Sequence, residues 1–294
     1  MSVHKRSYTK YTGPITRGRT RFGVLVRYAA TEAWSARSTV VLFVLCLLPA
    51  LISLSVIYVM NNDTVRLLLA GSHGGAPQID IDERFFYGML QAQCWPALAL
   101  TAWIGPKLIT GDLANDALPI LLSHPISRVE YVLAKLTVLA GFLSAVTWAP
   151  ALVLYVFQSY MSAVPWGGKN LHIAVGMFVG SILWIILLSL LSLAVASWVK
   201  WRIVATGLVF AAVFVPAGVG GVYNAVMRTD WGSLINIPLI MSTLWRRLLQ
   251  VSMPEYYTRH ELPTIFLVLA LAGICALCIW ALNLRIQARE VVRG

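Results

Sequence analysis

The sequence predicts an all-α integral membrane protein with six transmembrane helices. Of its 294 residues, 59% are hydrophobic and 12% are charged, whereas soluble domains carry about 25% charged residues. A helix needs about 20 consecutive apolar residues to cross a bilayer. Six uncharged stretches reach that length: 39–60, 85–106, 136–168, 171–199, 203–227 and 262–284. Each is continuously apolar, whereas the strands of a membrane β-barrel alternate apolar and polar residues, so helices are expected.

The segments between these stretches are too short to form a separate soluble domain. Residues 1–38 are expected to be a cytoplasmic basic tail with an interfacial helix, and residues 39–294 a six-helix transmembrane domain. The first apolar stretch starts at Thr39, behind a long polar lead. A secretory signal places its apolar region directly after a few basic residues. The N-terminal segment is therefore expected to stay on the protein.

The distribution of Lys and Arg predicts the orientation, because cytoplasmic loops carry more of both. With a cytoplasmic N-terminus, 16 of the 23 Lys and Arg residues lie inside. The others are Arg66, Arg84, Lys169, Arg228, Arg246, Arg247 and Arg259. Six spans return the C-terminus to the cytoplasm, so the chain is predicted to be multi-pass in the plasma membrane, or the inner membrane of a Gram-negative cell. This asymmetry explains the net charge of +11 without a nucleic-acid partner.

One segment before the first span shows helical periodicity. In residues 22–37, apolar residues from Phe22 to Ala33 share one side, and polar residues such as Arg27 and Glu32 share the other. This pattern predicts a helix that lies in the cytoplasmic interface. The alternative is a simple extension of the first span into water.

A second such segment, residues 228–261, lies on the predicted outer side. Its apolar residues recur at helical spacing from Ile237 to Leu248, and Arg246 and Arg247 face away from them. The pattern predicts re-entrant helices that fold back onto the outer membrane surface before the last span. A partly ordered loop is the alternative.

The cytoplasmic segment 107–135 carries the strongest local signals. Asp112 can cap a short helix that Pro119 limits. Ser127 and Glu130 then match a capping box at the start of the next apolar helix. The segment is therefore predicted to hold a short helix at the membrane surface between two spans. Such a helix can receive force from a soluble partner, and the alternative is a tight connection between two helices.

From residue 117 this segment reads ALPILLSHPISRVEYVLAK. With the acidic residue that follows the second span, the pattern resembles the permease subunits of type 2 ATP-binding-cassette transporters. The layout is similar to theirs over the whole chain, with an interfacial N-terminal helix, six spans and re-entrant outer helices. The motif itself is confined to residues 105–135. It departs from the family at His124, where Arg is common, and at Ala134, where Gly is common.

The resemblance implies that residues 111–122 form a coupling helix that docks on a separate ATP-hydrolysing subunit. It implies that this joint is held by Asp112, Asp116, Pro119, Ser127, Arg128 and Glu130. ATP and Mg²⁺ would bind the partner subunit, and no cofactor or metal is expected on this chain. A second permease copy, identical or different, would complete the membrane part within the lipid.

Sequence motifs of catalysis are not found. There is no GxxxxGK[ST] phosphate loop, so the chain is not expected to hydrolyse ATP itself. There is no HExxH zinc pattern and no GxSxG nucleophile elbow. Cys275 and Cys278 form a CxxC pattern in an apolar stretch, where packing is the expected role. The six spans lack Asp, Glu, Lys and Arg in their interiors, which favours a transporter moved by a partner over one driven by an ion gradient.

Three functions are consistent with the sequence. The first is the membrane subunit of an ATP-driven transporter. The second is a mechanical transducer of the same layout that acts on an extracytoplasmic protein without passing a solute. The third is a membrane anchor for a respiratory or assembly complex. In the first two, the spans offer no charge pairs for dimerisation, so apolar and small residues of the first and fifth spans are the expected contact.

Overall fold

The computed structural model describes residues 18–66, 79–114, 127–162, 165–252 and 262–285, and every regular element in these ranges is a helix. The first elements are α1 (Gly18–Trp34), α2 (Arg37–Cys46), α3 (Leu48–Asn61) and α5 (Glu83–Ala114). They are followed by α7 (Arg128–Val146), α8 (Trp148–Met161), α9 (Trp166–Lys169) and α10 (Leu171–Trp198). The last are α11 (Arg202–Met227), the 3-10 helix η1 (Trp231–Ile235), α12 (Ile237–Leu248) and α14 (Thr264–Arg285).

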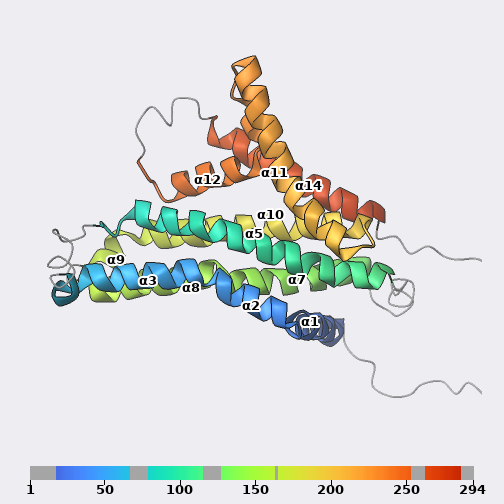
Figure 1. Ribbon diagram of the computed structural model, residues 1–294, viewed down its shortest axis with the longest axis horizontal. Coiled ribbons are helices and arrows are strands. Elements are labelled where there is room, and N and C mark those ends of the chain that lie inside the picture. Colours follow the sequence, from blue (N-terminus) through green and yellow to red (C-terminus); the bar gives the residue numbers. More distant parts are fainter. Residues whose placement is uncertain (1–17, 67–78, 115–126, 163–164, 253–261, 286–294) are drawn as a thin grey trace, which may run out of the picture.

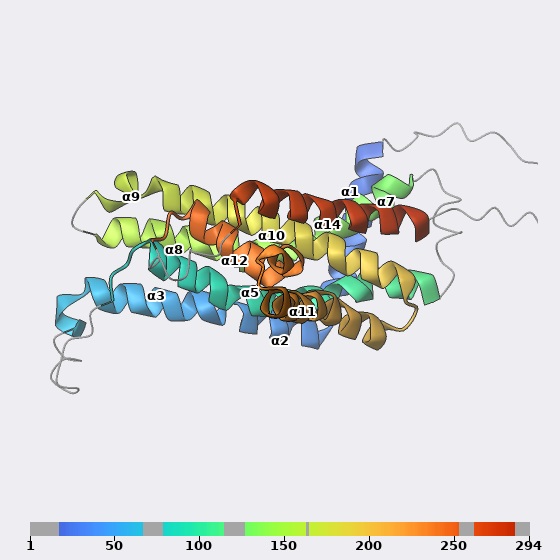
Figure 2. The same ribbon diagram turned by 90° about the horizontal axis from the view of Figure 1, so that it is seen from above.

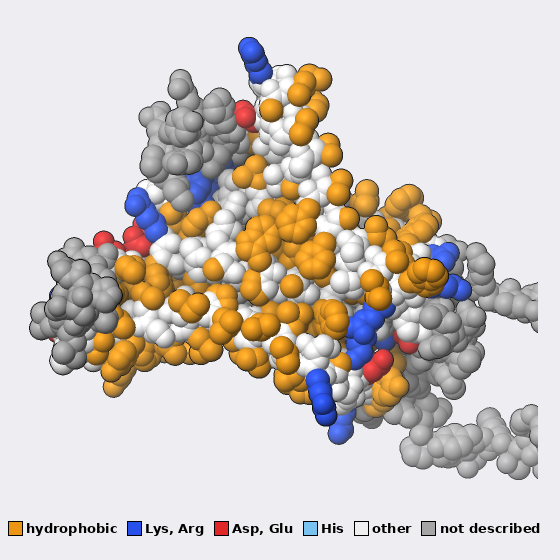
Figure 3. Space-filling model, viewed as in Figure 1, with side chains coloured by type: hydrophobic (Ala, Val, Ile, Leu, Met, Phe, Trp, Pro, Cys, Tyr) orange, Lys and Arg blue, Asp and Glu red, His pale blue; other side chains and the backbone are white. Residues whose placement is uncertain are grey.

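Five helical segments are long and apolar enough to cross a membrane. They are Arg37–Asn61, Arg128–Met161, Leu171–Trp198, Arg202–Met227 and Thr264–Arg285, and they correspond to five of the six predicted spans. Hydrophobic side chains are spread over the face shown in Figure 3. The chain is therefore a multi-pass α-helical membrane protein. α5, which contains the second predicted span, is not among the five, and it carries Gln91, Gln93 and Lys107.

The long helices lie side by side along the long axis of the molecule (Figures 1 and 2). One end holds α1, the start of α7, the end of α5 and the end of α14. The opposite end holds α9, the end of α3 and the start of α5. The first and last described helices therefore meet at the same end of the bundle. α11 starts at that end and then leaves the bundle, so that its C-terminal part stands apart from the other helices in Figure 1.

The third predicted span consists of two helices. α7 passes into α8 at Thr147, whose backbone has φ −108° and ψ −93°. Pro150 follows in the first turn of α8 and has no N–H to offer the carbonyl of Val146, four residues back. The side-chain amide of Gln93 on α5 donates a hydrogen bond to that carbonyl. The break between α7 and α8 is thus covered by a polar side chain of α5.

α10 is the central helix of the bundle. It packs against α5, α7, α8, α11, α12 and α14, and two thirds of its most apolar stretch is buried, against a third or less in the other four segments. Small residues allow this close packing. A Cβ at Gly176 would lie 2.8 Å from the backbone oxygen of Leu248, so α12 approaches α10 at that glycine more closely than an alanine there would allow.

Both amphipathic segments form helices with the predicted faces. In α1, Ala29 and Ala33 are buried and Glu32 is exposed. In α12, Ile237 and Leu244 are among the buried residues. The location of either helix on a membrane surface stays a prediction. Gly220 is the only glycine of the fifth span at which an added Cβ would collide with another atom, the backbone of Gly232 in η1.

Candidate functional site

The predicted coupling region lies at the end of the bundle where α1, α5 and α7 meet (Figure 1). Lys and Arg side chains gather near this end on the face shown in Figure 3. Asp116, Pro119 and most of the predicted coupling helix lie outside the described residues. The structure describes the two helix ends on either side of it, which are the last turn of α5 and the first turns of α7.

The start of α7 is fixed by the predicted capping box. The hydroxyl of Ser127 accepts a hydrogen bond from the Glu130 backbone N–H (3.1 Å). The Glu130 carboxylate in turn accepts one from the Ser127 backbone N–H (2.8 Å). Two N–H groups that would otherwise lack partners at the helix start are thereby satisfied. This sequence prediction is confirmed, and it fixes the residue at which α7 begins.

Asp112 has a different local role from the predicted one. It lies in the last turn of α5, which continues to Ala114, and it does not cap a separate helix. Its carboxylate accepts a hydrogen bond from the Tyr131 hydroxyl (2.6 Å) and lies 3.1 Å from the Lys135 ammonium. The prediction was wrong because α5 runs on past Pro106, which is accommodated inside the helix.

The partners of Asp112 are both buried against the bundle. Tyr131 is 2% exposed and Lys135 is 8% exposed. They are four residues apart on α7, so they share one face of the helix. The Lys135 ammonium also lies 5.4 Å from the centre of the Tyr131 ring. We call Asp112, Tyr131 and Lys135 the α5–α7 clasp. A buried Lys needs such partners, because an unpaired charge away from water is costly.

α1 is attached to the same end. The Lys107 ammonium on α5 donates a hydrogen bond to the backbone oxygen of Glu32 on α1 (2.6 Å). The Trp34 ring stacks on Phe142 of α7, with ring centres 5.5 Å apart. Therefore α1 is joined to α5 and α7 by polar and aromatic contacts.

Sequence reasoning found part of this region. Ser127, Glu130 and Asp112 were predicted, but Tyr131 was not, and Lys135 was counted only as a cytoplasmic charge. The four-residue spacing of Tyr131 and Lys135 held a usable signal, because residues four apart in a helix share one face. Arg128 is exposed and takes no part in the clasp. Cys275 and Cys278 are free thiols, and Cys278 is buried within the bundle.

In this region, charged and hydrogen-bonding groups connect α5 to α1 and to α7. No group of three metal-ligating side chains occurs among the residues that the structure describes. No protein-family model matches the chain, and no curated protein matches it either.

Proposed function

We propose that the chain is the permease subunit of a type 2 ATP-binding-cassette transporter with six spans, of which α5 is the second. α5 packs against α10 and lies beside it along the bundle in both views (Figures 1 and 2). Two of its buried polar side chains donate to backbone oxygens: Gln93 to that of Val146, and Thr101 to that of Ala97. A helix of this kind can cross a bilayer inside a bundle although it is less apolar than its neighbours.

We place both termini in the cytoplasm of a plasma-membrane protein. Six spans, with α5 as the second, would bring both termini to the same side, and the position of α1 and the end of α14 at one end of the bundle supports this. Most Lys and Arg residues of the sequence belong to that side by the positive-inside rule. α12 and the segment around it would then lie on the outer side as the re-entrant element.

The observation that carries the functional proposal is the α5–α7 clasp. The residues that resemble the family's coupling region lie between α5 and α7, and the clasp joins these two helices beside them. A nucleotide-binding subunit docked on residues 111–122 would bind ATP and Mg²⁺ itself. Its movement would pass through Asp112 and Lys135 into the two helices. A second permease copy, identical or different, would complete the complex.

The test is association of this chain with the ATPase subunit that co-purifies with it from its native membranes. Asp116→Ala and Arg128→Ala, made together, should leave membrane insertion intact and weaken ATPase association about tenfold or more, as expected for the loss of a charge-assisted hydrogen bond. Substitution of Pro119 or Ser127 should act differently, by changing the angle or the cap of a helix. Full ATPase binding and activity in the double variant would refute the coupling assignment.

The alternatives predict other outcomes of the same purification. If an ATPase is present and a solute stimulates its activity, the transporter is supported over the mechanical transducer. If ATP hydrolysis responds only to an extracytoplasmic protein, the transducer is supported. Purification with a respiratory or assembly complex that contains no ATPase would favour the membrane anchor.

A further inference from the structure

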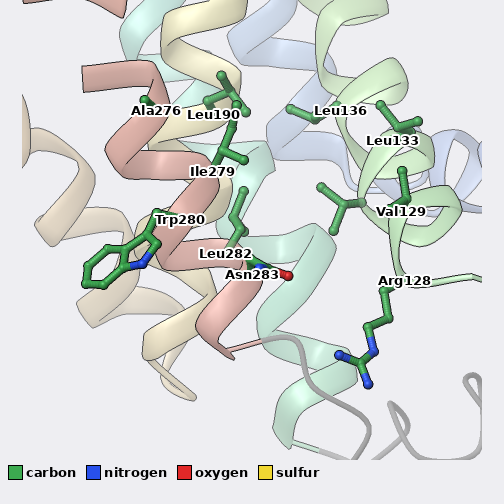
Figure 4. A pocket seen from close by; sticks show the side chains of 11 residues that line it. Arg128, Val129, Leu133, Leu136, Leu190, Ala276, Ile279, Trp280, Leu282 and Asn283 are labelled. Atoms are coloured by element: carbon green, nitrogen blue, oxygen red, sulfur yellow. The ribbon is translucent and has the colours of Figure 1, made fainter. Parts of the chain in front are cut away.

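A groove of about 540 Å³ lies between α7 and α14 near the end of the bundle that carries α1 (Figure 4). Its volume is within the range of about 300–1,000 Å³ that is typical of small-molecule sites. Val129, Leu133 and Leu136 line it from α7, and Ala276 and Ile279 line it from α14. Leu190 of α10 lies behind them. Most of the lining is therefore apolar.

Polar groups lie at the open end of the groove. Figure 4 shows the Arg128 guanidinium there, directed away from the apolar side chains, with Asn283 on the facing helix. Arg128 is the only cation among the lining residues. Its side chain has no hydrogen-bond or ion-pair partner within the described ranges, whereas the nearby Asp112 pairs with Lys135. The groove thus combines a long apolar part with one available positive charge.

The cation at the end of α14 differs in this respect. The Arg285 side chain donates to the backbone oxygen of Ser197 (3.4 Å), and its guanidinium lies 5.8 Å from the ring centre of Trp198. Both contacts belong to α10, so this side chain is engaged with the bundle. Arg128, unlike Arg285, is therefore not engaged with the bundle.

α7 and α14 both belong to segments that can cross a membrane. The apolar part of the groove would then face hydrocarbon, and its Arg128 end would lie at the level of the lipid headgroups. A ligand that fits has one alkyl chain and an anionic head. We propose that the groove binds an acidic phospholipid of the leaflet on the α1 side, with its phosphate on Arg128 and an acyl chain between Leu133 and Ile279. Basic pockets between transmembrane helices are known to select such headgroups.

The test uses the full chain purified in a mild detergent. Dioleoylphosphatidylglycerol and dioleoylphosphatidylcholine are titrated separately, and bound lipid is counted by native mass spectrometry. The wild type should bind the acidic lipid more tightly. Arg128→Ala should weaken binding of the acidic lipid about tenfold, as expected for one charge-assisted contact, and should change binding of the neutral lipid little. Arg128→Lys should keep part of the preference.

Two further variants separate the groove from general lipid attraction. Ala276→Trp should fill the apolar part and weaken binding of both lipids, and Leu133→Trp serves the same purpose if the first variant does not fold. Arg27→Ala removes an exposed charge of α1 at the same end of the bundle and should change neither affinity.

Three results would overturn the proposal. Equal affinity of the wild type for both lipids would show that the Arg128 charge does not select the acidic lipid. An equal loss in the Arg27 and Arg128 variants would indicate diffuse electrostatic attraction. Loss of a dimer mass in Ala276→Trp, with lipid binding unchanged, would assign the groove to a second copy of the chain. Arg128 also belongs to the proposed ATPase contact, but no ATPase is present in this assay, so its outcome does not depend on the proposed function.

Discussion

Gly105 of α5 and Ser192 of α10 are in such close contact that a Cβ at position 105 would lie 2.9 Å from the Ser192 Cβ and nearer still to its hydroxyl. The Ser192 hydroxyl donates to the backbone oxygen of Thr101 (3.2 Å), so it is held in this position. We expect Gly105→Ala to destabilise the protein by about 1–3 kcal/mol through overpacking, measured by thermal unfolding in detergent.

The controls for this contact come from the chain itself. Gly111 lies on the same helix, and nothing lies within 4 Å of the position that a Cβ would take there, so Gly111→Ala should not destabilise the protein. Adding Ser192→Gly to Gly105→Ala should recover most of the loss. If both alanine variants unfold at the same temperature as the wild type, the close approach of α5 and α10 does not determine stability.

The hydrogen bond between Gln93 and the Val146 backbone oxygen should depend on Pro150. Gln93→Leu should cost about 0.6 kcal/mol, the average for hydrogen bonds between membrane helices. With Pro150→Ala in place, residue 150 can itself donate to Val146, so Gln93→Leu should cost less. A double-mutant cycle in unfolding free energy measures the difference, and equal costs in both backgrounds would count against this explanation.

The α5–α7 clasp should stabilise the end of the bundle. Asp112→Asn should cost about 1.5–3 kcal/mol, because it leaves the buried Lys135 ammonium without its charge-assisted contact. Lys135→Met should cost less, because the Asp112 side chain is 26% exposed and keeps the hydrogen bond from Tyr131. The double variant should cost less than the sum of the two. The exposed pair of Asp63 and Arg66, 3.6 Å apart, is the matched control, and Asp63→Asn should change stability little. Additive costs at the clasp would show that the two charges do not interact.

Reporter fusions test the orientation and the crossing of α5. Fusions after residues 70 and 245 should be external, and fusions after residues 120 and 290 should be internal. The pair at 70 and 120 decides whether α5 crosses the membrane, since α5 is the only described helix between the two reporters. Reporters on the same side would leave five spans, and an external C-terminal reporter would exclude the six-span arrangement.

Cysteine crosslinking tests dimerisation through the first and fifth spans. Leu45 and Ile52 of the α2–α3 segment and Val219 and Val222 of α11 are exposed apolar residues. In a chain without its four natural cysteines, some of these positions should crosslink as dimers in the membrane. Val153 of α8 is equally apolar and exposed, and it should not. If only the α8 position gives dimers, the dimer interface lies at α8 and not at the first and fifth spans.

The sequence was sufficient to predict the five membrane-length segments, although not the break between α7 and α8. Continuous apolar stretches identified all five of the membrane-length segments, because apolar length is a local property that the bilayer requires of each span. The capping box at Ser127 and Glu130 was equally local, since both partners lie within one turn. The buried faces of α1 and α12 followed from helical periodicity.

Tertiary structure alone decided the contacts between helices. The role of Asp112 could not be read from its neighbours, because it depends on α5 continuing to Ala114 and on α7 presenting Tyr131 and Lys135. Likewise, nothing near Gln93 in sequence indicates that it covers a carbonyl beside Pro150. The sequence by itself determined which segments are helical and apolar enough for a membrane. The packing of those helices determined which polar side chains are paired, because partners far apart in the chain meet only in the folded bundle.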